Sequence, residues 1–254
     1  MSNKIIELLG VKISITNLLM AYEFIKHMIT QRQKGYVCVA PVATLVDSQR
    51  IKGYREVINQ AVMVTPDGMP VVWLAKLKGA KEIQRTYGPD LMRLVCNNGQ
   101  NLGLRHFFYG ATQQTLVQLQ NCLKALYPKI EIVGAYAPGF QSQAERISDE
   151  LVRLINDAKA DILWVGLGSP KQDFWMHINR SLLNVPVMVG AGAAFDFLSG
   201  AKPQAPIWMQ RSGLEWFFRF CCEPRRLWRR YLIGNSLFIF YILRDLFKGK
   251  NDTS

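Results

Sequence analysis

Short runs of β-branched and aromatic residues alternate along the chain with longer segments in which apolar residues recur every three or four positions. The short runs are typical of buried strands, and the longer segments are typical of amphipathic helices. The expected strands are 61–64, 104–110, 129–136, 160–168 and 185–192. The expected helices are 71–79, 111–128 and 169–183, the last with Ser169 as its cap and Pro170 in its first turn.

Strands that alternate with helices predict an α/β fold of the Rossmann-like layered kind, with a largely parallel sheet. No repeat, low-complexity tract or Ser/Gly linker interrupts this pattern before about residue 200. Beyond that point aromatic residues and arginines interleave, and no further strand is expected. We therefore divide the chain into an α/β domain (1–204) and a basic helical appendage (205–254).

The chain has 254 residues, of which 49% are hydrophobic, as expected for a globular core. Its formal net charge of +12 predicts an anionic partner: a nucleic acid, a membrane surface or a phosphorylated substrate. The N-terminal residues lack the features of a secretory signal, and the late apolar run 236–243 is far shorter than a membrane span. Five cysteines without CxxC spacing favour reduced thiols, so we expect a cytoplasmic protein.

Four breaks follow the expected strands: Asp67, Gly110–Thr112, Gly168–Pro170 and Gly190–Gly192. In an open parallel sheet, ligands bind outside the carboxyl ends of the strands, and helix N-termini there favour phosphates. Each break alone could be a tight turn, but together they favour a nucleotide diphosphate site. A dinucleotide fingerprint is the weaker interpretation, because "GLGSPK" and "GAGAAF" lack its third glycine.

Asp67 lies in "VTPDGMPVVW", and a Pro-Asp-Gly sequence is a turn signal that requires no function. A hairpin would need a strand directly after that turn. Pro70 and the apolar residues after it instead resemble a helix start. Asp67 is then expected in a strand-to-helix loop on the ligand side of the sheet, where a carboxylate can act as a general base.

Two further groups have both a structural and a functional interpretation. Arg85 could pair with Asp90, or it could hold a phosphate with two hydrogen bonds. Lys171 and Gln172 open a helix and could bind a diphosphate or be solvated. Because the three histidines are scattered and no Cys/His cluster or Asp-x-Asp pair is present, we expect no metal and no cofactor. Arginines and helix ends must then neutralise any bound phosphate.

After Pro224, a helical projection places four arginines in one sector and four apolar residues opposite them. The arginines are Arg225, Arg226, Arg229 and Arg230, and the apolar residues are Leu227, Trp228, Tyr231 and Leu232. Such a helix can lie on an anionic membrane surface. It can equally pack on its own domain through the apolar sector. Nucleic acid ranks third, since no recognised binding module is visible.

Six sequence blocks together resemble the WecG/TagA/CpsF glycosyltransferases, bacterial enzymes that extend sugars on undecaprenyl-diphosphate-linked intermediates. The blocks are "VTPDGMPVVW", "RTYGPDLM", "FFYGAT", "GLGSPKQDFW", "VGAGAAFDFLSG" and "QAPIWMQRSGLEWFFRFCCEPRRLWRR". They occur in the family's order over nearly the whole chain. The series is therefore far more specific than any single motif in it.

The resemblance implies a metal-independent, inverting transfer of a sugar from a UDP-sugar to a polyprenyl-diphosphate-linked saccharide. The enzyme would work at the inner face of the cytoplasmic membrane, with which it would associate peripherally. The family's proposed base falls on Asp67, and its functional arginine and glutamine fall on Arg85 and Gln172. Substrate-binding residues implied by the resemblance are Gly110, Gly168, Gly192, Asp196, Arg219, Arg226 and Arg229.

The chain departs from the family at one place. Many members have Thr-Pro-Asn where this chain has Ala40-Pro41-Val42, so that Thr44 is the nearest hydroxyl and is expected to bind substrate in its place. We expect the departure to bear on which sugars are used, for example in exopolysaccharide assembly. Two other functions compete: a nucleotide-binding scaffold that docks on the membrane without catalysis, and a nicotinamide oxidoreductase. The sequence leaves a homo-oligomer open.

Overall fold

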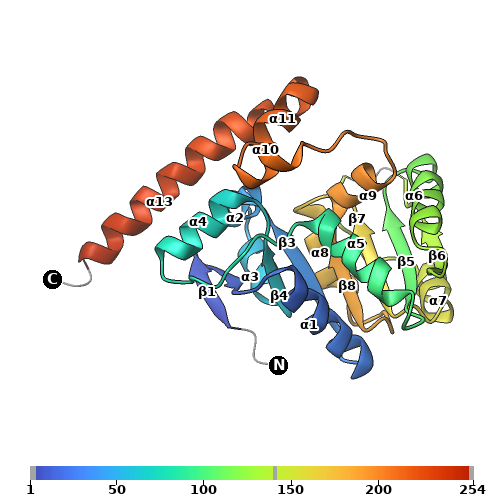
Figure 1. The fold of residues 1–254 in the computed structure, drawn as a ribbon. Helices are drawn as coiled ribbons and strands as arrows, with labels where there is room; N and C mark the ends of the chain where they lie inside the picture. The colour runs from blue at the N-terminus through green and yellow to red at the C-terminus, as the bar shows by residue number, and fades with distance from the viewer. Residues whose placement is uncertain (1–3, 140–141, 252–254) are drawn as a thin grey trace.

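The computed structural model describes residues 4–139 and 142–251, and it is built on a six-stranded parallel sheet (Figure 1). The strand order is β4-β3-β8-β7-β5-β6, with a separate antiparallel hairpin of β1 and β2. The bounds are β1 (Ile5–Leu8), β2 (Val11–Ser14), β3 (Gly35–Ala40), β4 (Met63–Pro66), β5 (Arg105–Gly110), β6 (Glu131–Tyr136), β7 (Ile162–Gly166) and β8 (Val187–Gly190). The predicted α/β fold with a parallel sheet is confirmed.

Helices cover both faces of this sheet. One core layer contains residues of α1 (Leu18–Thr30), α5 (Gly88–Gly99), α6 (Gln113–Leu126) and α9 (Gly192–Leu198). The other contains residues of α2 (Val42–Arg50), α3 (Tyr54–Asn59), α4 (Met69–Leu77), α7 (Asp149–Asp157) and α8 (Lys171–Asn179). Because successive strand residues point to opposite faces, Trp164 and Val165 of β7 enter different layers. Except for β6 at the edge, whose residues are half-buried or exposed, the strands of this sheet are therefore buried on both sides, which explains their continuous apolar runs.

From residue 207 to residue 251 the described chain is mostly helical, as expected. The helices are α10 (Ile207–Arg211), α11 (Glu215–Cys222), α12 (Pro224–Trp228), the π-helical turn η1 (Arg229–Ile233) and α13 (Gly234–Asn251). Long helix α13 runs along α2 (Figure 1), and Phe238 is buried in the same core layer as Leu45 of α2. The appendage and the sheet thus share a core, and the boundary at residue 204 stays a prediction. The last three residues of the appendage, 252–254, lie outside the described residues.

Two local features differ from the sequence-based expectation. Helix α8 begins at Lys171 with Pro170 at the cap position, and no side chain caps it, so Ser169 is not its cap. The Ser169 hydroxyl instead accepts a hydrogen bond from the Gln172 amide at 3.1 Å. After Pro224 the helix is not uniform, because η1 interrupts it. A π-turn advances less per residue than the 100° of an α-helix, which changes the side on which later residues lie.

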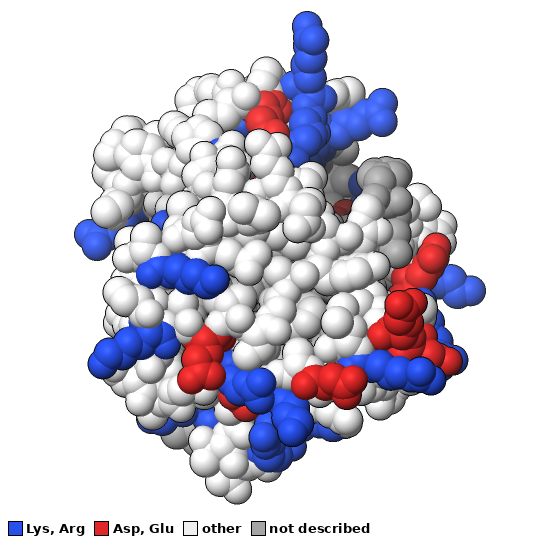
Figure 2. Space-filling model, turned by 90° about the vertical axis from the view of Figure 1, so that its right-hand side faces the viewer, with Lys and Arg blue, Asp and Glu red and all other residues white. Residues whose placement is uncertain are grey.

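The positive charge is not one continuous band on the face drawn in Figure 2. Basic and acidic side chains are intermixed over its lower half, around a broad uncharged area. Mainly basic side chains project at its upper end. This is the height at which α10 and α11 lie in Figure 1. Within the described ranges 4–139 and 142–251, no helix combines the length and the apolarity that crossing a membrane requires.

Candidate active site

A cavity of about 650 Å³ lies at the carboxyl end of the sheet. The loops after β3, β4, β5, β7 and β8 all contribute to its wall. Helices of the C-terminal segment form the opposite wall, through residues of α11, α12, η1 and α13. The cavity thus lies between the two parts of the chain, and neither part encloses it alone.

The position of Asp67 is set by the end of β4 and the turn that follows it. Its backbone N–H donates to the carbonyl of Ala40 on β3 at 3.1 Å, which continues the parallel pairing by one residue. Gly68, with a φ of +88°, then turns the chain into α4, whose second residue is Pro70. Asp67 is therefore in a strand-to-helix loop and not in a hairpin. Its side chain lines the cavity and is 19% exposed.

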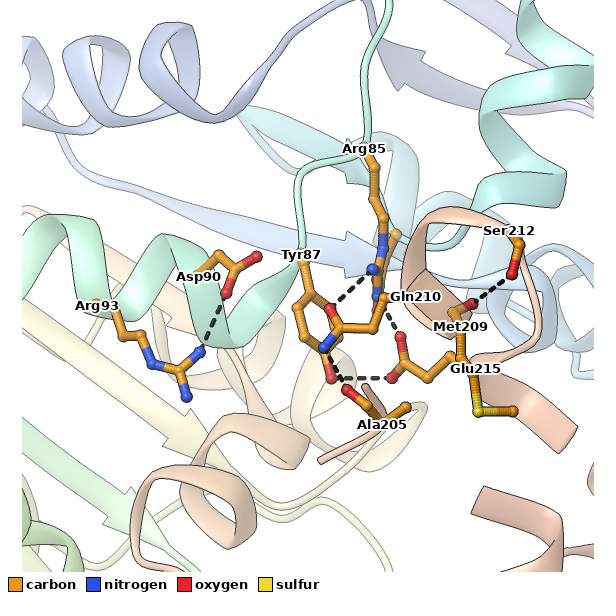
Figure 3. Close-up of polar contacts among 10 residues, drawn as sticks. Arg85, Tyr87, Asp90, Arg93, Ala205, Met209, Gln210, Ser212 and Glu215 are labelled. Atoms are coloured by element: carbon orange, nitrogen blue, oxygen red, sulfur yellow. Dashed lines mark hydrogen bonds and ion pairs between the residues drawn. The ribbon is translucent and has the colours of Figure 1, made fainter. Parts of the chain in front are cut away.

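Arg85 is held by contacts to three polar side chains and one aromatic ring, and Figure 3 shows the contacts with Gln210 and Glu215. Its Nη2 lies 3.6 Å from Oδ1 of Asp67, and the same nitrogen donates to the carboxylate of Glu215. Its Nη1 donates to Oε1 of Gln210 at 3.2 Å. The guanidinium carbon lies 3.9 Å from the ring centroid of Tyr87, a cation–π arrangement. The arginine is thus fixed from several sides.

Asp90 does not pair with Arg85. It forms an ion pair with Arg93, one turn further along α5, at 3.1 Å (Figure 3). The Tyr87 hydroxyl donates to Oε1 of Glu215 at 2.8 Å. Glu215 therefore receives hydrogen bonds from two residues of the 85–87 segment. Of the two interpretations of Arg85, the pairing with Asp90 is excluded by this geometry.

The surroundings of Asp67 favour its protonated form more than water does. Burial is the main cause and raises the pKa of Asp67 to about 6, and the negative charge of Glu215 acts in the same direction. The charges of Arg85, Arg219 and Arg230 act in the opposite direction. A carboxylate with a pKa near 6 is largely ionised at neutral pH, yet it is a stronger base than an ordinary aspartate. These are the properties that a general base requires.

Gln172 joins the loops after β7 and β8. Its Oε1 accepts hydrogen bonds from the N–H groups of Gly168 and Gly192, each at 3.1 Å. A Cβ on Gly192 would lie only 2.8 Å from the Gly168 nitrogen, so the close approach of the loops requires glycine. The Gln172 side chain is almost fully buried. Its effect on the cavity is therefore to hold together the two loops, after β7 and β8, that form part of the wall.

The outer wall of the cavity is basic. Arg219, Arg226 and Arg230 line it from the C-terminal helices and face the loops that Gln172 joins. Arginines can hold phosphate oxygens with two hydrogen bonds each, so the cavity suits a diphosphate. Asp196 also lines the cavity and pairs with Lys202 at 2.9 Å. Among the described residues, no three His, Cys, Asp or Glu side chains lie close enough to hold a metal ion.

Thr44 and Gly110 do not reach the cavity, although we expected both to bind substrate. Thr44 is buried within α2, and its neighbours Pro41 and Val42 form the wall instead. A Cβ on Gly110 would lie 2.6 Å from the backbone of Gly166, so this glycine allows the ends of β5 and β7 to approach. Its role in the structure is packing beneath the loops.

Arg229 is also placed differently from our expectation. Its guanidinium lies above the ring of Trp228, 5.1 Å from the centroid. Among the described residues that line the cavity, Arg230 and Tyr231 stand side by side. The projection had placed these two in opposite sectors, but they are neighbours at the border between the sectors, and Arg226 and Leu227, one turn earlier, also line the cavity. The structure thus brings Arg230 to the site where we expected Arg229.

Sequence reasoning also missed three residues that hold Arg85, namely Tyr87, Gln210 and Glu215. All three lie within the sequence blocks that resemble the family. Glu215 carried a usable signal, because it is one of only two acids, with Glu223, in the block 204–230, which is rich in arginine and aromatic residues. Its partner, however, lies 130 positions earlier in the chain, and no local pattern specifies that pairing.

Comparisons with known proteins agree with this site. Three relatives share the name N-acetylglucosaminyldiphosphoundecaprenol N-acetyl-beta-D-mannosaminyltransferase. The protein from Bacillus spizizenii is 31% identical over 82% of this chain and 80% of its own length. The Bacillus subtilis protein is 29% identical (82% and 78%), and the Staphylococcus aureus protein is 27% identical (88% and 87%). The model of the glycosyl transferase WecG/TagA/CpsF family matches residues 6–252. The chain therefore belongs to this family and is a glycosyltransferase.

Proposed function

We propose that the enzyme transfers a sugar from a UDP-sugar to an undecaprenyl-diphosphate-linked saccharide, with inversion and without a metal ion. The acceptor class is supported by the names of the relatives, which specify an N-acetylglucosaminyl-diphospho-undecaprenol acceptor. Those names also specify a β-linked product. If the donor is an α-linked UDP-sugar, a β product requires inversion. The transfer would belong to the assembly of a surface polysaccharide.

The observation that carries the proposal is the position of Asp67 beside Arg85 in a cavity lined by further arginines. In an inverting transfer the acceptor hydroxyl attacks the anomeric carbon in a single step. The new C–O bond forms as the bond from that carbon to the β-phosphate oxygen breaks, and Asp67 takes the hydroxyl proton. One carboxylate suffices, because the reaction has no covalent intermediate to form or resolve.

The leaving UDP gains negative charge on its β-phosphate as the bond breaks. Arg219, Arg226 and Arg230 line the cavity and can compensate this charge without reorganising during the step. The N–H groups of Gly168 and Gly192 are already bound to Gln172. We therefore assign the diphosphate mainly to the arginines, and we assign Gln172 to the positioning of the loops.

The sugar-binding part of the cavity includes an apolar section. Pro41 and Val42 line the wall beside Asp67, and the hydroxyl of Thr44 is buried behind them. This section offers the substrate van der Waals contact and no hydrogen bond from a side chain. We propose that it sets the choice of sugar, so the donor can differ from the N-acetylmannosaminyl donor that the relatives' names imply.

We propose further that the C-terminal helices bring the site to the inner face of the cytoplasmic membrane, where a lipid-linked acceptor resides. Large apolar side chains are exposed along them, among them Trp208, Phe217, Ile239 and Phe240. Exposed aromatic residues interleaved with arginines suit the headgroup region of an anionic membrane. The same helices form one wall of the cavity, so membrane contact and substrate binding involve the same elements.

The test is a turnover assay with the purified protein. A panel of UDP-sugars is combined with polyprenyl-diphosphate-linked saccharides, with and without a chelator, and released UDP is measured. We expect release only when donor and acceptor are both present, and equally with the chelator. UDP-sugar binding without release for any acceptor would favour the scaffold. Loss of release with the chelator would contradict the metal-free reaction.

A further inference from the structure

Glu215 is the first residue of α11, yet its contacts are with the loop between α4 and α5. Its two carboxylate oxygens accept hydrogen bonds from Arg85 and from the Tyr87 hydroxyl (Figure 3). Gln210, from α10, adds a contact to the other terminal nitrogen of Arg85. The C-terminal segment therefore forms hydrogen bonds with Arg85, the same arginine that lies close to Asp67.

This ion pair differs from an ordinary surface pair. The side chains of Arg85 and Glu215 are each only 14% exposed, so water screens their interaction weakly. The guanidinium also stacks on the Tyr87 ring, which restricts its rotation. By contrast, Lys78 at the end of α4 and Asp245 of α13 form a pair that is 33% and 41% exposed, and neither residue lines the cavity. Exposed pairs of that kind contribute little.

Arg85 Nη2 faces two carboxylates at once. It bonds to Glu215 and lies 3.6 Å from Asp67, which is longer than a hydrogen bond. Glu215 thus accepts a direct hydrogen bond from this nitrogen, whereas the contact with Asp67 is only electrostatic. A base must keep its lone pair available for the substrate proton, and a carboxylate bonded directly to an arginine is a weaker base.

We propose that Glu215 is a positioning residue for the transfer reaction: it holds Arg85 off Asp67, so that the site is complete only when α11 is docked. The proposal deepens the proposed function and rests on it for the role of Asp67. It also gives a reason for a basic segment to carry a buried acid at this point. Without Glu215, Arg85 would be free to bind Asp67 directly.

Among the described residues, the charged groups that act on Asp67 are Arg85 from the loop before α5, Glu215 and Arg219 from α11, and Arg230 from η1. The neutral phenols of Tyr87 and Tyr231 are coupled to it as well. Glu215 raises the pKa of Asp67, whereas Arg85 lowers it. Replacing Glu215 by glutamine removes the first effect and strengthens the second. Both changes lower the pKa of Asp67, so the sign of the result is fixed.

The experiment compares Glu215→Gln with Asp245→Asn, which removes one negative charge from the same C-terminal segment at the exposed pair. The pKa of Asp67 is measured by carboxyl carbon NMR titration of the substrate-free protein, with Asp67→Asn to assign the signal. The acidic limb of kcat/KM against pH is measured on the same variants. In Glu215→Gln we expect both to move to lower pH by about one unit, as for the loss of one nearby charge. In Asp245→Asn we expect neither to move.

A third variant, Glu215→Asp, keeps the charge but shortens its reach. We expect kcat to fall about tenfold from misplacement of Arg85, with the KM for the donor nearly unchanged. Circular dichroism checks that each variant folds. An Asp67 signal that titrates at the same pH in Glu215→Gln as in the unmodified protein would overturn the proposal, as would undiminished kcat in Glu215→Asp.

These outcomes are separable from failure of the proposed function. The NMR titration needs no substrate, so it tests the effect of Glu215 on Asp67 even if no acceptor is turned over. Turnover retained by Asp67→Asn would remove Asp67 from the base role and overturn the positioning role that depends on it. An NMR shift in Glu215→Gln would still establish the electrostatic link between α11 and Asp67.

Discussion

Arg85 Nη2 lies 3.6 Å from Oδ1 of Asp67, although α4 and the loop after it separate the two residues in the sequence. The guanidinium is close enough to influence the carboxylate and too far for a direct hydrogen bond. Burial and Glu215 raise the pKa of Asp67 more than the arginines lower it, and the result is a pKa of about 6. The contact thus leaves the carboxylate ionised and basic.

The first prediction concerns Asp67→Asn. An asparagine has nearly the same shape but cannot accept the acceptor's proton, so we expect kcat to fall by about 10²- to 10⁴-fold. Binding of UDP should be retained, because the arginines that we assign to the diphosphate are unchanged. Released UDP measures the rate, and calorimetric titration with UDP measures binding. Undiminished turnover would remove Asp67 from the reaction.

The second prediction is the pH dependence of the unmodified enzyme. Because the base must be ionised, kcat/KM should be constant above the pKa of Asp67 and fall tenfold per pH unit below about 6. The effect on stability has the opposite sign. A raised folded-state pKa contributes stability that is fully present below the unfolded pKa of about 3.9 and is lost as the pH rises through about 6. Asp67→Asn should lack this pH-dependent contribution, which denaturant titrations at several pH values would measure.

The sheet and the position of Asp67 follow from local rules. Apolar runs followed by Gly- or Pro-containing breaks mark the strand ends, and Pro70 two residues into a helix places Asp67 in a strand-to-helix loop. Parallel strands bring such loops to one edge, so the approach of Asp67 to the loops at Gly168 and Gly192 could be anticipated. These features depend on residues that are close together in the sequence.

The rest of the site depends on pairings that no local pattern specifies. Glu215 meets Arg85 only because α11 docks over the cavity. Arg230 takes the place expected for Arg229 because the cavity faces the border between the arginine sector and the apolar sector of the helix. At Gly110, backbone packing against Gly166 is by itself sufficient to require a glycine. From the sequence alone, a loop glycine that makes room for a bound phosphate cannot be told from one that makes room for a neighbouring strand.

The third prediction concerns Gln172→Ala. This change leaves the N–H groups of Gly168 and Gly192, two half-buried residues, without their partner, and each such group costs up to about 1–3 kcal/mol. We expect the melting temperature to fall by about 5–10 °C, together with weaker UDP binding from looser loops. Gln120→Ala in α6 is the control, since that side chain bonds only to the carbonyl one turn earlier. A melting temperature equal to that of the control would contradict the bridging role.

The fourth prediction separates crowding from backbone conformation. Gly53 and Gly110 both have positive φ, at +78° and +125°, but a Cβ on Gly53 would meet nothing within 4 Å. Gly53→Ala should therefore cost about 1–2 kcal/mol, the ordinary strain of an L-residue in this region. Gly110→Ala adds a collision with the backbone of Gly166, so it should destabilise by clearly more. Urea unfolding measures both, and equal costs would show that the packing of β5 against β7 tolerates a side chain.

The fifth prediction concerns the membrane surface. Arg225 and Arg229 are exposed, and Arg229 lies above the exposed ring of Trp228, so both can meet lipid headgroups. Each arginine near an anionic surface contributes about 1 kcal/mol, and reversing both charges should weaken binding at least about tenfold. Flotation with phosphatidylglycerol-rich vesicles measures this, with phosphatidylcholine vesicles as the uncharged reference.

The matched control for this prediction reverses two exposed charges elsewhere. Lys124 on α6 and Arg153 on α7 lie away from the C-terminal helices, and their double change to glutamate alters the net charge equally. If vesicle binding depends on where the charges lie, it should fall for Arg225→Glu/Arg229→Glu and not for Lys124→Glu/Arg153→Glu. Equal losses would mean that only the total charge of the protein matters. Equal binding by all three proteins would remove the C-terminal arginines from membrane contact.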